Sequence, residues 1–321
     1  MLAVRARQAG GPEVLEVVDI PTPVPAEGQI LVRHVAIGLN FIDTYQRSGL
    51  YPIKFPAVLG QEAAGVVEAV GGGVNRFAVG DRVAYLGSGA YAEAQIVAAD
   101  RAVRLPEAIP FQIAAAALLK GMTAEFLLRR CHPVKSGETV LVHAAAGGVG
   151  TILVQWAKAR SARVIGAVGS VEKAALARSF GCDEVILSRD EDVAARVREL
   201  TGGEGVQVAY DSVGKDTFEG TLASLARRGV FVSFGNASGP VPAFEPLRLS
   251  RAGSLFFTRP TLFDYIATTE ELDASAAALF EMIGAGKIRI EIGQTFPLSE
   301  ARRAHEALEG RATTGASVLI P

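Results

Sequence analysis

Short β-prone runs separated by glycine and proline fill the first third of the chain. They lie at 29–36, 64–70, 81–85 and 91–97. Gly71, Gly72 and Gly73 and the prolines at 21, 23 and 25 mark turns between such runs. This pattern predicts a compact, mostly antiparallel β domain.

From about Phe111 the hydrophobic pattern changes to alternating strands and helices. A succession of strand, helix and strand predicts a parallel sheet with right-handed crossovers, and hence an α/β, doubly wound fold. A last helix near 270–283 and a strand at 317–320 are expected to rejoin the N-terminal domain, because six strands complete the sheet. The predicted strands are 139–143, 163–168, 184–187, 206–210, 230–234 and 254–258, and the helices between them are 149–159, 171–180, 191–200 and 216–226.

One uncharged stretch, 139–157, is long enough to cross a membrane. It opens with a β-branched alternation and breaks at Gly147, Gly148 and Gly150 before it resumes as ILVQWA. We interpret it as a strand, a glycine turn and a helix that are buried together in an α/β domain.

Composition narrows the possible partners. The chain is 49% hydrophobic and 21% charged, with a formal net charge of −2, which is typical of a globular protein. No sequence-wide attraction for nucleic acid or anionic membranes follows from this charge. Two cysteines, Cys131 and Cys182, predict reduced thiols, and the N-terminus lacks the apolar core of a signal peptide, so we expect a cytoplasmic protein.

The glycine turn carries a nucleotide-binding pattern. It reads Ala145-x-Gly147-x-x-Gly150 after a predicted strand and before a predicted helix. Gly147 lets the backbone approach a pyrophosphate, and Gly150 lets the helix lie close to the strand. The free amides of the helix N-terminus then face the phosphates. This context predicts a dinucleotide site.

The end of the next strand indicates which dinucleotide binds. Sites for NAD place an acidic residue there, to hold the ribose 2′-hydroxyl. Here the strand ends at Gly169 and Ser170, with Lys173 following, and no acid precedes Glu172. A hydroxyl and an ammonium group suit a 2′-phosphate, so the residues favour NADP(H) over NAD(H).

Two common catalytic sets are absent from the sequence. The histidines lack metal-ligand spacing and neither cysteine lies in the β domain, so no zinc site is predicted. No tyrosine has a lysine four residues later, which argues against a short-chain reductase.

These residues resemble the medium-chain dehydrogenase/reductase superfamily. Its zinc members carry a Gly-His-Glu signature, which stands here as Gly60-Gln61-Glu62, and Asn40 lies where the first zinc cysteine would fall. The segments GLNFIDTYQRSGLYP, HAAAGGVG, YDSVGKDTF and RRGVFVSFGNASG are similar to those of the zinc-independent, zeta-crystallin-like branch of bacterial NADPH:quinone oxidoreductases.

The resemblance implies a fold, an assembly and roles by position. It implies an NADPH-dependent homodimer that reduces quinones, with a catalytic GroES-like domain at 1–121 plus 260–321 and a Rossmann domain at 122–259. Cleft residues near the nicotinamide would be Asn40, Phe41, Ile42, Asp43, Tyr45, Tyr51 and Thr123. Cofactor contacts would be Gly147, Gly148, Val149, Gly150, Gly169, Ser170, Lys173, Phe234, Gly235, Asn236, Ser238 and Arg311. Relatives often place a tyrosine where this chain has Ser188, so Ser188 or Arg189 is expected to complete the 2′-phosphate site.

The expected chemistry resides mostly in the cofactor. Asn40 would hydrogen-bond a quinone oxygen and Tyr45 would donate a proton or a hydrogen bond, or both would only bind. The aromatic cleft segment, with Arg47 as its only cation, suits a flat uncharged ring. Both hydride and single-electron transfer fit these residues.

Two other functions fit the same features. One is reduction of α,β-unsaturated carbonyls, which uses a similar cleft. The other is a non-catalytic NADPH-binding regulator or RNA-binding protein, against which the net charge and the lack of aromatic-basic clusters argue.

The strand predicted at 254–258 bears on assembly. It is apolar and lies at a sheet edge in the doubly wound order, and an apolar edge is stable only when it is paired. Pairing with its symmetry mate would give a closed dimer, with Leu255 or Phe257 on the outward face.

Overall fold

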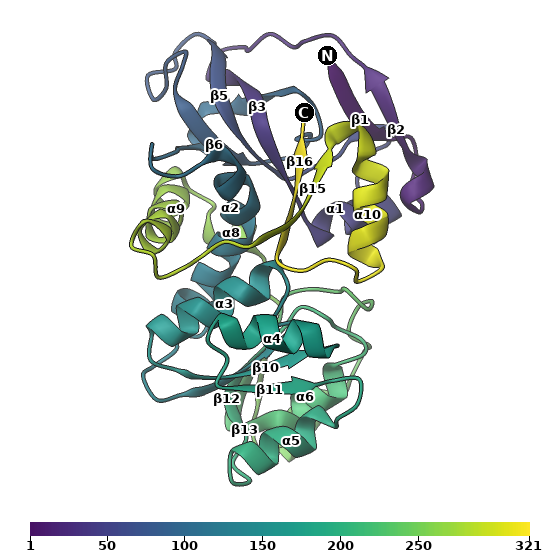
Figure 1. Cartoon of the computed structure of the whole chain (residues 1–321), viewed down its shortest axis with the longest axis vertical. Helices are drawn as coiled ribbons and strands as arrows, with labels where there is room; N and C mark the ends of the chain where they lie inside the picture. The colour runs from purple at the N-terminus through teal and green to yellow at the C-terminus, as the bar shows by residue number, and fades with distance from the viewer. The chain divides into compact units, whose positions relative to one another are not determined.

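The computed structural model describes residues 1–321 (Figure 1). Its contacts divide the chain into two compact units. Unit 1 comprises Met1–Met122, Ile266–Gly286 and Ile290–Pro321, and unit 2 comprises Thr123–Tyr265 and Lys287–Arg289.

Unit 2 is built on a six-stranded parallel sheet, as the alternating pattern predicts. The strand order is β11-β10-β9-β12-β13-β14. Figure 1 shows α3 and α4 on one side of this sheet and α5 and α6 on the other. The strands are β9 (Thr139–His143), β10 (Arg163–Val168), β11 (Glu184–Leu187), β12 (Val206–Asp211), β13 (Leu225–Ser233) and β14 (Phe256–Thr258). The helices are α3 (Gly148–Ala159), α4 (Val171–Ser179), α5 (Val193–Leu200), α6 (Phe218–Ser224), α7 (Leu247–Arg251) and α8 (Leu262–Tyr265).

The order of the strands creates a topological switch point. The chain runs outward from β9 through β10 to β11 and then returns to place β12 on the other side of β9. Crossovers leave in opposite directions from the carboxyl ends of β9 and β12, which opens a crevice there. The glycine turn follows β9 directly, so the fold places it at that crevice.

Several predicted bounds differ from the observed ones, most clearly at the end of this sheet, where the strand predicted at 230–234 is observed as the longer β13. The helix predicted at 216–226 ends at Ser224, because β13 already begins at Leu225 and pairs there with Val206. The last strand begins at Phe256, since Ser254 adopts a left-handed φ of 57° that interrupts an extended run. The predicted outward face was wrong, because Leu255 is buried and Phe257 packs on the core, whereas Phe256 is 62% exposed.

Unit 1 is mostly antiparallel, as predicted, with a parallel pair formed by its last two strands. It contains a three-stranded sheet, β2-β1-β4, and a seven-stranded sheet, β15-β16-β3-β5-β6-β8, in which β7 also pairs with β3. The strands are β1 (Leu2–Ala6), β2 (Leu15–Asp19), β3 (Gln29–Leu39), β4 (Ala57–Val58), β5 (Glu62–Val70), β6 (Arg82–Leu86), β7 (Ala94–Ala98), β8 (Ala102–Arg104), β15 (Ile292–Pro297) and β16 (Ala316–Ile320). The helices are α1 (Phe41–Ser48), α2 (Phe111–Phe126), α9 (Thr269–Gly284) and α10 (Ala301–Glu309).

The C-terminal strand rejoins the first part of the chain, which confirms the expectation from its apolar pattern. In β16, Val318 pairs with Gly38 and Leu319 pairs with Ile37, antiparallel to β3. All four residues lie in the interior of unit 1. Strand β3 therefore pairs with a strand about 280 positions away in the chain. The residues around β3 do not specify this partner.

Helix α2 is apolar on nearly all sides. With the π-helical turn Leu127–Cys131 that continues it, it spans 21 residues, and its most apolar 18-residue window has a mean hydropathy of 1.3. The protein itself buries 78% of its most apolar window, as expected for a core helix. A Cβ on Gly121 would lie 2.3 Å from Leu279 Cδ1, so glycine lets α9 approach α2 closely.

Candidate functional site

The turn between β9 and α3 leaves backbone amides uncovered. Gly147 is the N-cap of α3 in an extended conformation, and no side chain caps this helix. Ala144 has a φ of 51°, a conformation that is rare for a residue with a Cβ and that concentrates at functional turns. A Cβ on Gly150 would lie 2.2 Å from the Ala144 carbonyl oxygen, so only glycine allows this approach. The N-terminus of α3 therefore offers N–H groups and a positive dipole end to an anion.

The end of β10 provides cationic side chains. The Ser170 hydroxyl accepts a hydrogen bond from the Lys173 N–H at 3.3 Å and so caps α4. A Cβ on Gly169 would lie 3.3 Å from Arg189 Nε, which places the guanidinium directly beside this turn. Ser188 instead donates its hydroxyl to the Val168 carbonyl at 3.1 Å, within the sheet. Ser188 and Arg189 were the two residues expected to replace the tyrosine of relatives. Of these, Arg189 lies with its side chain at the turn after β10.

A buried aspartate organises the loops after β12 and β13. Asp211 is fully buried and accepts hydrogen bonds from the Val213 N–H at 2.7 Å and the Thr221 hydroxyl at 2.8 Å. Ser238 donates both its N–H, at 2.8 Å, and its hydroxyl, at 2.9 Å, to the Val213 carbonyl. A Cβ on Gly235 would lie 2.4 Å from the Ser212 carbonyl oxygen. The segment Phe234–Ser238 is therefore tied closely to the end of β12, at the switch point.

In unit 1 three elements converge on the side chain of Asn40. Asn40 is the N-cap of α1, Glu62 begins β5, and Lys120 lies on α2. The amide oxygen of Asn40 accepts a hydrogen bond from Lys120 Nζ at 2.7 Å, and its amide nitrogen donates to Glu62 Oε2 at 2.9 Å. The Lys120 ammonium also lies 3.4 Å from Glu62 Oε2. We call Asn40, Glu62 and Lys120 the amide cluster; all three are buried.

The rest of α1 divides into an aromatic group and a buried polar chain. The Tyr45 ring lies 5.2 Å from the Tyr51 ring and 6.1 Å from the Phe41 ring. Asp43 is fully buried, accepts hydrogen bonds from the Asn40 N–H at 2.8 Å and the Tyr91 hydroxyl at 3.0 Å, and leaves one carboxyl oxygen without a partner. Burial raises the pKa of Asp43 to about 7, because the charged form is disfavoured away from water.

Arg47 closes this polar chain. It donates two hydrogen bonds to the Glu309 carboxylate, at 2.9 and 2.7 Å, and its side chain is 2% exposed. It also contacts His305, whose pKa is lowered to about 3 by burial and by the arginine charge. Arg47, the only cation of the predicted cleft segment, therefore lies in the interior of unit 1 and is paired there with Glu309.

The sequence matches two family models and is similar to several known proteins. Residues 26–107 match the alcohol dehydrogenase GroES-like domain, and residues 148–281 match the zinc-binding dehydrogenase family. The chain is 54% identical to a quinone oxidoreductase of Salmonella typhimurium and 55% identical to one of Pseudomonas aeruginosa, with 97% of each chain covered in both comparisons. The chain belongs to the quinone oxidoreductase family of medium-chain dehydrogenases/reductases.

Solved structures agree with this family assignment. The crystal structure of Escherichia coli quinone oxidoreductase complexed with NADPH aligns over 100% of both chains with a TM-score of 0.98 and 49% sequence identity. Both the resemblance and the fold class inferred from the sequence are therefore confirmed: a doubly wound Rossmann sheet accompanies a mostly antiparallel, GroES-like β domain.

The zinc ion implied by one family description does not fit the residues of this chain. Asn40 is engaged in the amide cluster, and Gln61 donates hydrogen bonds to the Gln46 side chain at 3.0 Å and to the Ser88 hydroxyl at 3.2 Å. Amide groups are poor zinc ligands beside thiolate and imidazole. No group of three or more His, Cys, Asp or Glu side chains is arranged to hold a metal.

The structure distributes the predicted site residues over both units. In unit 1, Asn40 caps α1, Phe41, Ile42 and Tyr45 lie on it, and Tyr51 follows its end with its ring against Tyr45; Arg311 follows α10 with a left-handed φ of 57°. Thr123 belongs by its contacts to unit 2, on α2. In unit 2, Gly147, Gly148, Val149 and Gly150 start α3, while Gly169, Ser170, Lys173 and Ser188 gather at the ends of β10 and β11.

Sequence reasoning missed two members of the amide cluster. Glu62 was visible in the Gly-Gln-Glu signature, but no role was assigned to it. Lys120 lies in a helix that otherwise reads as apolar core, so a buried lysine in ALLKGM was the one available signal. The structure shows that a cation does lie beside Asn40, although the cleft segment itself supplies none.

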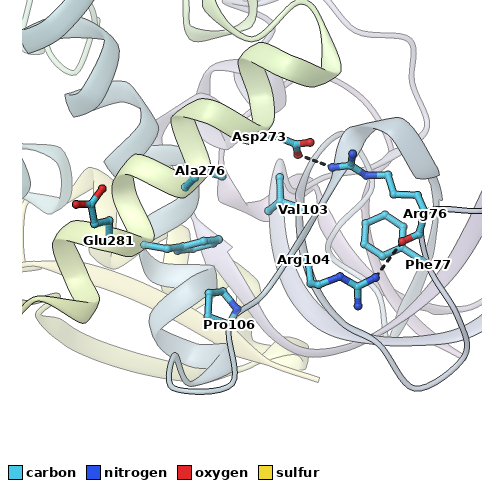
Figure 2. A pocket seen from close by; sticks show the side chains of 10 residues that line it. Arg76, Phe77, Val103, Arg104, Pro106, Asp273, Ala276 and Glu281 are labelled. Atoms are coloured by element: carbon cyan, nitrogen blue, oxygen red, sulfur yellow. Dashed lines mark hydrogen bonds and ion pairs between the residues drawn. The ribbon is translucent and has the colours of Figure 1, made fainter.

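A cavity of about 620 Å³ lies elsewhere in unit 1, between the β8 region and α9 (Figure 2). Arg76 pairs with Asp273 there, and Arg104 donates to the Arg76 carbonyl at 3.0 Å. Phe77 forms part of its wall, between the two guanidinium groups. None of the predicted site residues lines this cavity, and its polar groups are largely paired with one another.

Proposed function

We propose that this protein reduces quinones with NADPH and without a metal ion. The observation that carries the proposal is the similarity to quinone oxidoreductases over almost the whole chain, at more than half of all positions identical. A related enzyme of the same fold has been crystallised with NADPH. The uncapped N-terminus of α3 and the cationic turn after β10 support the same cofactor.

We propose specific contacts for that cofactor. The turn from Gly147 to Gly150 would hold the pyrophosphate on the amides of α3. Lys173 and Arg189 would bind the 2′-phosphate, with the Ser170 hydroxyl. Ser188 would contribute through its own backbone, because its hydroxyl is hydrogen-bonded to the Val168 carbonyl within the sheet. Further contacts would come from Phe234, Gly235, Asn236, Ser238 and Arg311.

The chain's own residues would bind and orient the substrate. When bound, NADPH supplies the reducing equivalents. The rings of Phe41, Tyr45 and Tyr51, with Ile42, would pack against a flat conjugated ring. Asn40 would donate a hydrogen bond to a quinone oxygen, and Tyr45 would donate a proton or a hydrogen bond. Thr123 would be a further cleft residue. Asp43, interior to unit 1, would act by fixing the start of α1.

The proposed function is tested by steady-state NADPH oxidation. The acceptors are a benzoquinone, a naphthoquinone and a 2-alkenal, with a secondary alcohol and NADP⁺ in the reverse direction and NADH in parallel. We expect turnover of the quinones with NADPH, much less with NADH, and none of the alcohol. An alkenal that is the best substrate by an order of magnitude would replace quinone reduction with reduction of unsaturated carbonyls. Salt-sensitive binding of RNA in a gel shift, without turnover, would support the non-catalytic alternative.

Domain roles and location complete the proposal. Residues 1–121 with 260–321 would form the catalytic domain and 122–259 the NADPH-binding domain. We propose a cytoplasmic protein without nucleic-acid or membrane partners.

We also propose a homodimer, formed through β14. This strand ends the six-stranded sheet and exposes Phe256. Unpaired strand edges are stabilised by pairing across a two-fold axis. In light-scattering measurements Phe256→Glu should give monomers or insoluble protein, whereas Val79→Glu, at a comparably exposed apolar site of unit 1, should stay dimeric. A wild-type mass equal to one chain of 33.6 kDa would refute the dimer.

A further inference from the structure

The hydrogen bonds of the amide cluster determine which way the Asn40 amide points. An ammonium group only donates hydrogen bonds and a carboxylate only accepts them. The oxygen of the amide must therefore face Lys120 and its nitrogen must face Glu62, as the distances of 2.7 and 2.9 Å show. A reversed amide would set nitrogen against ammonium and oxygen against carboxylate. The two charged partners thus allow one orientation of Asn40.

The partners are themselves held in place. Glu62 Oε1 accepts the backbone N–H of Leu119 at 2.6 Å, and Glu62 is fully buried. A Cβ on Gly38 would lie 2.3 Å from Glu62 Oε2, so glycine at this position makes room for the carboxylate. Lys120 is 5% exposed, and its charge is balanced within the cluster by Glu62. Burying this pair costs desolvation free energy, which a merely structural contact between apolar side chains would avoid.

We infer that Lys120 and Glu62 are positioning residues, which fix the Asn40 amide so that its second N–H is presented as the hydrogen-bond donor to the quinone oxygen. One N–H of the amide is used by Glu62, which leaves the other for a ligand. The ammonium on the amide oxygen polarises the amide and strengthens that remaining donor. A preorganised donor stabilises the charge that develops on the oxygen during reduction. The inference rests on the proposed quinone reduction and names residues to which neither the family descriptions nor the sequence assign a role.

A double-mutant cycle tests whether Lys120 acts through Asn40. Lys120→Met keeps the length of the side chain and removes its charge and donors. We expect it to lower kcat with a quinone by about ten-fold or more, with little change in the KM for NADPH. In an Asn40→Ala background the same substitution should change kcat by less than about two-fold, since contacting residues couple. Equal fold-losses in both backgrounds would overturn the inference. The exposed Lys135→Met is the matched control and should leave kcat unchanged.

Loss of folding is separated from loss of positioning by a second variant. Lys120→Met leaves the Glu62 charge buried without its cation, which destabilises the fold. The double variant Lys120→Met with Glu62→Gln removes both charges and should recover the thermal stability, but it should not recover kcat. Recovery of both would show that the pair serves stability alone and would overturn the inference.

The orientation of the amide is also measurable without substrate. The side-chain NH₂ signals of Asn40 are assigned in ¹H–¹⁵N spectra by their absence in Asn40→Ala. In the wild type we expect two well-separated proton shifts and slow exchange with water; in Lys120→Met the separation should shrink and exchange should accelerate. Unchanged signals in Lys120→Met would refute the positioning role even if the enzyme proved to reduce something other than quinones. Absence of wild-type quinone turnover with the expected spectra would refute only the proposed function.

Discussion

The glycine turn and the amide cluster show two ways of building a site. The turn runs from Ala144 to Gly150, uses backbone N–H groups, and is formed by residues that follow one another in the chain. The amide cluster uses side chains from α1, β5 and α2, and Lys120 lies 80 positions from Asn40. The first depends on the absence of Cβ atoms, whereas the second depends on paired charges.

This difference predicts how each site fails. A backbone site is damaged by atoms that are added, because Gly150 lies against the Ala144 carbonyl. A side-chain site is damaged by atoms that are removed, because each buried charge then loses a partner. The glycine turn should therefore tolerate no larger residue at its close contact, while the amide cluster should tolerate the removal of both charges better than the removal of one.

The largest expected effect comes from adding one methyl group to the glycine turn. Gly150→Ala would place a Cβ 2.2 Å from the Ala144 carbonyl oxygen, so α3 must shift. We expect the free energy of unfolding to fall by about 1–3 kcal/mol and NADPH affinity to fall at least ten-fold. Urea unfolding and fluorescence titration measure the two quantities. Gly220→Ala on α6, where a Cβ meets nothing within 4 Å, is the control and should be neutral or slightly stabilising. Wild-type affinity in Gly150→Ala would contradict this account of the turn.

The next effect is confined to binding and leaves folding unchanged; it is expected from the side chains beside the second turn. Lys173→Ala and Arg189→Ala each remove one cation from the proposed 2′-phosphate site. Either change should raise the Kd for NADPH about ten- to a hundred-fold and leave the Kd for NADH nearly unchanged. Isothermal titration with both cofactors checks this. Equal losses for NADPH and NADH would show that these residues do not contact the 2′-phosphate, and Lys135→Ala should affect neither Kd.

The smallest effect concerns Asp43, which holds the helix that carries Asn40. Its pKa is raised to about 7 in the folded state from the usual aspartate value of 3.8. Between these values the folded protein keeps a proton that the unfolded chain has released, so stability falls as pH rises. From pH 5 to pH 6 the wild type should lose about 1.4 kcal/mol of unfolding free energy relative to Asp43→Asn.

Urea unfolding of both proteins at the two pH values measures this slope. Asp19→Asn is the control, because Asp19 is exposed and its pKa is lowered by the N-terminal ammonium group. The contribution of Asp19 is lost only as pH falls through that lowered pKa, so Asp19→Asn and the wild type should show no relative change between pH 5 and pH 6. A difference between wild type and Asp43→Asn that is independent of pH would show that Asp43 is ionised in the folded protein.

The sequence by itself determined the features that depend on neighbouring residues. The first three strands of the parallel sheet were predicted with their observed bounds, because buried parallel strands are continuous apolar runs, here separated by the helices α3 and α4. The conformation of the glycine turn was predictable for a similar reason, since Gly147 and Gly150 lie close to backbone atoms within a few positions of themselves. The outward face of β14 was mispredicted, because the left-handed Ser254 delays the start of the strand and the core then selects Leu255 and Phe257.

Only the tertiary structure decided which side chains surround Asn40. Lys120 lies in an apolar helix, and nothing in its neighbouring residues indicates that α2 passes the start of α1. Arg47 lies in the segment expected to line the cleft, yet Glu309 draws it into the interior from the other end of the chain. Arg189 rather than Ser188 faces the turn after β10, because the Ser188 hydroxyl bonds within the sheet. For Lys120 and Arg47 the partner is distant in sequence, and burial makes the pairing obligatory, since a buried charge without a partner is strongly destabilising.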